Sequence, residues 1–170
     1  MIKQLLRKAK ARYRAEGHGI HSPFAYRFVT DVMRHRRGYA FYGYSDIEAA
    51  TTDSRRRRFA CLALRVAAAM SPGETIIEGN DTALGVALTG IARRGNPPLM
   101  VVGPDGSPST DSVNDVIAAG GTIILAPEHR DFSAHVQQLM TAGMSFTTPA
   151  GTTVIVANPR LPLSHYTVSN

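Results

Sequence analysis

Acidic side chains and glycines follow the first β-branched run of the chain. The run Thr75–Ile77 leads into the sequence EGNDTALG, which occupies residues 78–85. A nucleotide-type site in an open α/β sheet has an acid at the end of a strand and glycines in the next turn. The glycines let the backbone approach the ligand closely. A plain turn, with Asn80 or Asp81 capping the following helix, explains this sequence equally well. The candidate cofactor-binding residues of the turn are Glu78, Gly79, Asp81 and Gly85.

A second acid, Asp105, follows the next β-branched run, Leu99–Val102, within the sequence GPDG. It stands twenty positions after Gly85. This spacing suits a carboxylate that accepts hydrogen bonds from the two hydroxyls of a ribose. Pro-Asp-Gly is also a common surface turn, so both interpretations stay open here.

The last β-branched run, Thr153–Val156, is followed by Asn158 in an Asn-Pro pair. An amide and a carbonyl at this location could hold a planar amine, which makes Asn158, with one of the tyrosines, the catalytic candidate that would position a substrate. Prolines after a strand also serve simply to turn the chain. No nucleophile–base pair, phosphate-binding loop or zinc pattern accompanies these residues.

Four consecutive arginines, Arg55, Arg56, Arg57 and Arg58, form a dense local charge. Consecutive helix positions are about 100° apart, so these side chains encircle a helix rather than form one face. Together with the N-terminal Lys/Arg cluster they predict contact with nucleic acid or a protein partner, and solvated cations are the alternative. Three aromatic residues could stack on bases or pack on the core: Tyr39, Tyr42 and Tyr44.

Histidine and cysteine contribute little to the candidate chemistry. His18 and His21 are spaced as metal ligands, but no Cys or carboxylate cluster accompanies them, and no metal site is expected. Cys61 is the single cysteine and stands among apolar residues, which predicts a buried, unreactive thiol.

The elements that must position these residues follow the pattern of an α/β fold. After Glu74, short β-branched runs alternate with helical stretches, which predicts βαβ units and a mostly parallel sheet with helices on both faces. Helices are expected near 83–94, 112–119 and 132–142, and residues 144–148 are expected to form either a strand or a loop. Before Glu74, helices are expected over 2–15, from Ser22-Pro23 to about Gly38, and from either 45–46 or 52–53 to Met70.

Charge divides the chain into two expected parts. Residues 1–70 hold fifteen Lys/Arg and five Asp/Glu, whereas residues 71–170 hold four and eight. We therefore expect a basic helical extension over 1–72, packed on a Rossmann-like core over 73–170. No apolar run of membrane-spanning length and no signal peptide is visible, so a cytoplasmic protein is expected.

The stretch GHGIHSPFAYRF at residues 17–28, followed by the tyrosine-rich residues 39–48, resembles the N-terminal extension of a family of bacterial class I S-adenosylmethionine-dependent methyltransferase-like proteins. From 71 to 158 the resemblance is one of order and spacing. It implies S-adenosylmethionine as cofactor and Asp105 as the ribose-binding acid. It also implies a sheet of four strands in the order 3-2-1-4, without the last strands of that family's core.

Two departures from the family pattern bear on function. The glycine loop at 79–85 is degenerate, and Asn158 stands where the family has an acid-bearing segment near the methyl donor. One hypothesis is a methyltransferase with an unknown acceptor. The other is a non-catalytic binding module that uses its basic extension for nucleic acid or a protein partner. One edge strand of such a sheet would be exposed. We expect it to be covered by the N-terminal extension, by the C-terminal tail or by a second subunit of a homo-oligomer.

Overall fold

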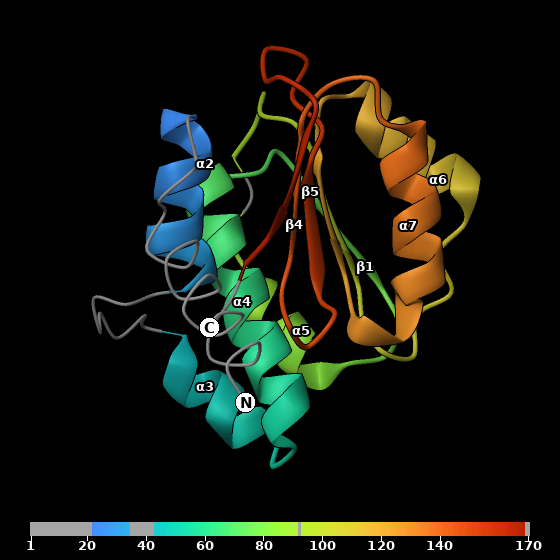
Figure 1. Ribbon diagram of the computed structural model, residues 1–170. Helices are drawn as coiled ribbons and strands as arrows, with labels where there is room; N and C mark the ends of the chain where they lie inside the picture. The colour runs from blue at the N-terminus through green and yellow to red at the C-terminus, as the bar shows by residue number, and fades with distance from the viewer. Residues whose placement is uncertain (1–21, 35–42, 92, 169–170) are drawn as a thin grey trace, which may run out of the picture.

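The computed structural model describes residues 22–34, 43–91 and 93–168, which form an α/β structure around one mixed sheet. Figure 1 shows this sheet between two layers of helices. The six strands are β1 (Thr75–Glu78), β2 (Leu99–Val102), β3 (Thr122–Leu125), β4 (Met144–Thr147), β5 (Thr153–Val156) and β6 (Ser164–Thr167).

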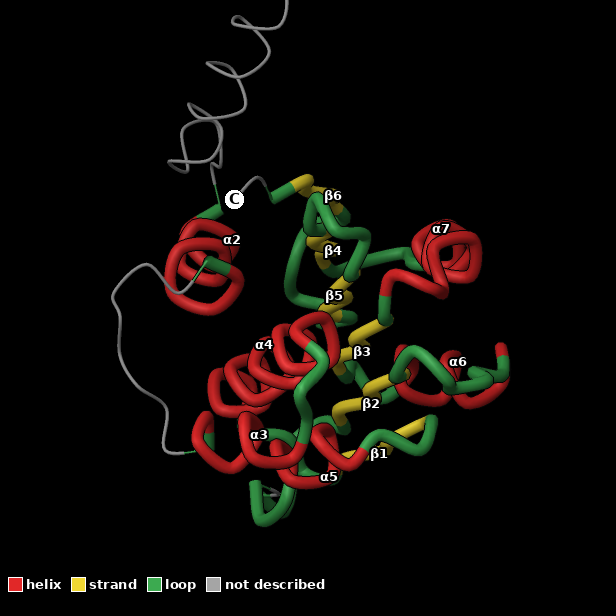
Figure 2. Tube along the Cα trace, turned by 90° about the horizontal axis from the view of Figure 1, so that it is seen from below, coloured by secondary structure: helices red, strands yellow, loops and turns green. Residues whose placement is uncertain are grey.

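Helices cover both faces of the sheet, as Figure 2 shows in a view along the strands. On one face lie α2 (Pro23–Arg27), the π-helix η1 (Phe28–Met33), α3 (Tyr44–Ala50), α4 (Ser54–Met70) and α5 (Thr82–Leu88). On the other lie α6 (Thr110–Ala118) and α7 (Arg130–Leu139), the latter preceded by the 3-10 turn η2 (Pro127–His129). In the described part of the chain, no helix combines the length and apolar character needed to cross a membrane.

The predicted start signals of the N-terminal helices are confirmed. The Ser22 hydroxyl accepts a hydrogen bond from the Ala25 N–H at 3.3 Å, and Pro23 occupies the first helical position. The third predicted helix is two helices, because both of its alternative starts are used, at Tyr44 and at Ser54. The second of them ends at Ser71, whose φ of 47° is left-handed.

The helices before residue 72 share a hydrophobic core with the sheet. Alternate strand residues point to opposite faces, so Val101 packs toward α4 and α5 while Val102 packs toward α6. Phe146 of β4 lies 4.8 Å from the ring of Phe28 and 5.3 Å from the ring of Tyr166. These ring contacts pack η1 against the edge of the sheet that β4 and β6 form.

The α/β class is confirmed, but the predicted sheet is wrong in strand number and order. The strands lie in the order β1-β2-β3-β5-β4-β6, and β5 runs antiparallel to both of its neighbours. The physical reason is the connection at residues 148–152, which is too short for a parallel crossover of a dozen or more residues. β4 and β5 therefore form a hairpin, and β5 occupies the position between β3 and β4.

The connections around β1, β2 and β3 also differ from a doubly wound pattern. Both steps go the same way across the sheet, yet α5 packs on one face and α6 on the other. The two βαβ units consequently have opposite hands, as can be followed in Figure 2. About 98% of such units are right-handed, so a prediction that assumes the common hand cannot place α5 and α6 on opposite faces of the sheet. β1 is an outer strand, whereas the order 3-2-1-4 requires it inside.

Candidate functional site

Most of the candidate residues lie at one end of the sheet. Glu78, Val102 and Leu125 are in register at the carboxyl ends of β1, β2 and β3, and Leu125 pairs with Thr153 at the start of β5. The turns after the three parallel strands and the β4–β5 hairpin consequently meet at this end. Ligands of open α/β sheets bind at such carboxyl ends.

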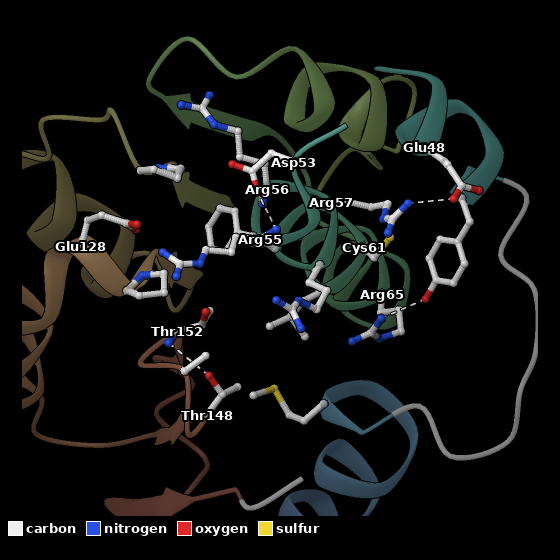
Figure 3. A pocket seen from close by; sticks show the side chains of 18 of the residues that line it. Glu48, Asp53, Arg55, Arg56, Arg57, Cys61, Arg65, Glu128, Thr148 and Thr152 are labelled. Carbon is white, nitrogen blue, oxygen red and sulfur yellow. Dashed lines mark hydrogen bonds and ion pairs between the residues drawn. The ribbon is translucent and has the colours of Figure 1, made fainter. Parts of the chain in front are cut away.

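A cavity of about 1000 Å³ opens between this carboxyl end and α4. Figure 3 shows Glu128, Thr148 and Thr152 facing the arginines of α4 across it. The residues from α3 and α4 include Tyr44, Glu48, Asp53, Arg55, Arg56, Arg57, Arg58, Cys61 and Arg65. The turns and the hairpin contribute Pro104, Asp105, Pro127, Glu128, Thr148 and Thr152. We call this space the arginine cleft.

Asp53 starts α4 and satisfies its first backbone donors. Its carboxylate accepts hydrogen bonds from the N–H groups of Arg55 at 2.7 Å and Arg56 at 3.4 Å. These bonds, the one from Arg55 above all, lower the pKa of Asp53 below its ordinary value of 3.8. Because the helix N-terminus is already capped, the positive character of the cleft comes from side chains.

Arg56 lies between the two aspartates that the sequence singled out. Its Nη2 donates a hydrogen bond of 2.7 Å to Asp105, and its Nη1 lies 3.8 Å from Asp81 Oδ2. The bond to Asp105 is the main reason that the pKa of Arg56 is raised. This trio joins α4 to the turns after β1 and β2.

Asp81 is the buried member of the trio, with a side chain only 4% exposed. Its Oδ1 caps α5 by accepting hydrogen bonds from the N–H groups of Ala83 at 2.9 Å and Leu84 at 3.3 Å. Its Oδ2 is buried without a hydrogen bond, so within the described residues Arg56 supplies the nearby positive charge. A buried carboxylate oxygen of this kind favours a cation beside it.

Two further arginines of the cleft hold structure together. Arg57 pairs with Glu48 of α3 at 2.8 Å. Arg65 donates to the Val32 carbonyl at 2.7 Å and to the Tyr44 hydroxyl at 2.9 Å, which ties α4 to η1 and α3. These guanidinium groups are committed to partners inside the protein.

Arg55 and Arg58 are the uncommitted arginines. In the described part of the chain, Arg58 uses only its Nε, which donates to the Ser54 carbonyl of its own helix at 3.1 Å. Among the described residues, the guanidinium of Arg55 makes neither a hydrogen bond nor an ion pair. Both side chains are exposed and line the cleft. A guanidinium with free donors binds phosphate or carboxylate oxygens in a bidentate manner.

The structure brings Glu78, Gly79, Asp81 and Asp105 together, but the glycine does not face open space. Gly79 has a φ of +109°, and a Cβ there would lie 3.0 Å from the Gly106 nitrogen. A Cβ on Gly106 would lie 2.6 Å from the Glu78 carbonyl oxygen. The first glycine therefore lets two turns of this chain pack on each other.

Gly85 and Asn158 lie apart from that group. Gly85 is exposed in α5, and a Cβ there would have no atom within 4 Å. Asn158 follows the carboxyl end of β5, which is antiparallel, so it lies at the opposite end of the sheet. Its side-chain oxygen accepts a hydrogen bond from the Arg160 N–H at 2.9 Å, which stabilises the local turn.

Several predicted features fall outside the described residues: His18, His21, Tyr39, Tyr42 and the N-terminal Lys/Arg cluster. Tyr44 lines the cleft. Cys61 is half-buried there rather than fully buried as predicted, and burial raises the pKa of its thiol. No group of three potential metal ligands occurs in the described ranges.

Sequence reasoning missed the contribution of the third turn. His129 Nε2 lies 2.8 Å from the Gly103 carbonyl, and Glu128 lines the cleft beside it. The signal was available, because both residues follow the third β-branched run and carboxyl ends of parallel strands share one end of a sheet. Thr148 and Thr152 were not predictable in this way, since they reach the cleft through the antiparallel hairpin.

Comparison with known proteins gives no match: no protein-family model, no curated protein and no solved structure matches this chain. The resemblance to methyltransferase-like proteins therefore rests on the sequence segments alone.

Proposed function

We propose that this chain is a non-catalytic binding module whose arginine cleft holds phosphoryl groups, either of a free nucleotide or of a nucleic-acid strand. The observation that carries the proposal is the pair of uncommitted guanidinium groups, Arg55 and Arg58, in a cleft at the carboxyl end of the sheet. Arginine is the side chain best suited to phosphate because its planar fork matches two oxygens at once.

The size and position of the cleft support a ligand of nucleotide dimensions. Ligand pockets typically measure roughly 300–1000 Å³, and this cleft of about 1000 Å³ lies at the upper limit. The hydroxyls of Thr148 and Thr152 and the ring of Tyr44 add hydrogen-bonding and stacking groups to the lining.

The direct test is fluorescence anisotropy with labelled single-stranded RNA and DNA of about 12 nucleotides. Changing Arg55→Ala and Arg58→Ala together should weaken binding by tenfold or more, in line with about 1.4 kcal/mol or more for two lost charge-assisted contacts. The salt dependence should fall too, by about 0.7 in the slope of log K against log salt, since the two arginines bind one phosphate and each neutralised phosphate of a single strand contributes about 0.7.

The matched control is Arg93→Ala with Arg94→Ala, which removes the same charge from exposed residues before β2, at the other end of the sheet. This control should bind as the unchanged protein does. Competition by AMP at micromolar concentration would identify a free nucleotide as the ligand, whereas competition only by strands would identify nucleic acid. Equal losses in both double variants would refute a specific cleft.

A methyltransferase is the second proposal, and the meeting of Glu78, Asp81 and Asp105 at one end of the sheet favours it. The residues do not fit S-adenosylmethionine well, however. Arg56 already binds the Asp105 carboxylate, and Gly79 packs on Gly106.

Calorimetric titration with S-adenosylmethionine and S-adenosylhomocysteine separates the two proposals. A micromolar dissociation constant, about −8 kcal/mol, that is lost on Asp105→Ala would favour the methyltransferase. Absence of heat at millimolar ligand, together with phosphate-dependent anisotropy, would favour the binding module.

A further inference from the structure

We infer that Asp105 is a displaceable internal counter-ion, and that the guanidinium of Arg56 is a second anion subsite of the arginine cleft. The inference rests on the proposed function and deepens it. It assigns the ligand to molecules with two neighbouring phosphoryl groups, such as a nucleoside diphosphate or two adjacent phosphates of a strand.

The two acidic partners of Arg56 differ in how firmly they are held. Asp81 is 4% exposed and has its Oδ1 bound to two backbone N–H groups of α5. Asp105 is 58% exposed, and within the described residues its carboxylate has Arg56 as its one hydrogen-bonding partner. The buried acid is therefore fixed, while the exposed acid can leave.

The turn that carries Asp105 allows that movement without a change of backbone. Its main chain is closed by a hydrogen bond of 3.0 Å from the Gly106 N–H to the Gly103 carbonyl. Gly106 in turn packs on the Glu78 carbonyl. Rotation of one exposed side chain is enough to uncover Arg56, and such rotations take picoseconds to nanoseconds.

Arg56 keeps its position when Asp105 leaves. Its Nη1 stays 3.8 Å from the buried Asp81 Oδ2, which accepts no hydrogen bond from any described residue. The Nη2, now bound to Asp105 at 2.7 Å, would then be free for a ligand oxygen. A phosphoryl group carries more charge and more acceptor oxygens than a carboxylate, so it competes well for a guanidinium.

The two subsites belong to one helical turn. Arg55 and Arg58 offer free donors, and Arg56 lies between them in sequence, about 100° around the helix from Arg55. A single phosphoryl group satisfies the uncommitted pair. A second phosphoryl group, linked to the first, would bind the guanidinium of Arg56 once Asp105 has released it.

The test compares ADP with AMP in calorimetric titrations of the unchanged protein and of Asp105→Asn. The amide keeps the size of the side chain but competes weakly for Arg56. We expect the ratio of ADP to AMP affinity to rise about fivefold, the upper range for release from an exposed ion pair. Arg56→Lys, which retains charge but lacks the fork, should lower that ratio.

Asp115→Asn is the matched control, since it removes the same charge from an exposed position on α6, on the opposite face of the sheet. It should leave the ratio unchanged. A ratio that stays constant or falls in Asp105→Asn, while the protein still binds AMP, would overturn the inference and leave the proposed function standing. If AMP, ADP and the labelled strands all fail to bind either protein, the inference and the proposed function fail together.

Discussion

The two ends of the sheet are closed in different ways. At the amino end, loops pack backbone against backbone: the Ala157 N–H donates to the Gly121 carbonyl at 2.9 Å, and the Thr122 N–H donates to the Pro98 carbonyl at 2.9 Å. At the carboxyl end, the turns also bond through their backbones, as the Gly103 N–H does to the Glu78 carbonyl at 2.9 Å, but α4 is joined to these turns by charged side chains, with Arg56 at the centre. The amino end of the sheet is thus closely packed, whereas the carboxyl end contains the arginine cleft.

This difference shows why the candidate site lies where it does. Backbone groups that bond to each other leave neither space nor free donors for a ligand. Charged side chains can exchange one partner for another, particularly where one of them is exposed. The carboxyl end of this sheet is therefore the end at which a ligand can bind.

The largest expected effect is on stability and comes from disrupting the backbone packing at the amino end of the sheet. Gly143 has a φ of +101°, and a Cβ there would collide with the Val156 carbonyl oxygen. Gly143→Ala should therefore lower the free energy of unfolding by about 3 kcal/mol, as measured by urea denaturation. Gly85→Ala is the control, because its helix position has open space and should gain about 0.5–1 kcal/mol. Equal effects of the two changes would contradict tight backbone packing at this end.

A smaller effect, the pH dependence of local stability, distinguishes the two ends of the sheet. Backbone hydrogen bonds lower the pKa of Asp53 from 3.8, so its carboxylate stabilises the start of α4 above that pH. As the pH falls below it and through the lowered pKa of the folded state, this contribution is lost. The protection factors of the Arg55 and Arg56 amides against hydrogen exchange should then fall, while that of the Ala157 amide should not.

Asp53→Asn provides the control for the acid effect, since asparagine still caps a helix but carries no charge. Its melting temperature should depend less steeply on pH between about pH 5 and pH 2. Identical pH dependence in the two proteins would mean that Asp53 does not anchor the carboxyl end.

The smallest effect concerns Asn158. Among the residues that the structure describes, its side chain bonds only within its own turn at the amino end, so Asn158→Ala should change the free energy of unfolding by about 1 kcal/mol at most. Binding of AMP and of S-adenosylmethionine should be unaffected, as calorimetry can measure. A loss of either ligand on this change would show that the two ends of the sheet cooperate in one site.

Much of the local structure was predictable because short-range chemistry decides it. Ser22-Pro23 starts a helix, Asp53 and Asp81 cap helices, and the β-branched runs form strands. The turn interpretation of Asp81 is correct, and its proximity to Asp105 follows from the neighbouring parallel strands. Each of these features depends on residues within a few positions of one another, or on one strand pairing.

The sequence by itself determined the α/β class, the helix starts and the placement of acids at strand ends, because periodicity and capping act locally. Only the tertiary structure decided the strand order, the direction of β5 and the role of Arg56. Those depend on a five-residue hairpin that excludes a parallel crossover, and on a guanidinium that finds partners 25 and 49 positions away. That long-range pairing turned two candidate ligand-binding carboxylates into partners of an arginine.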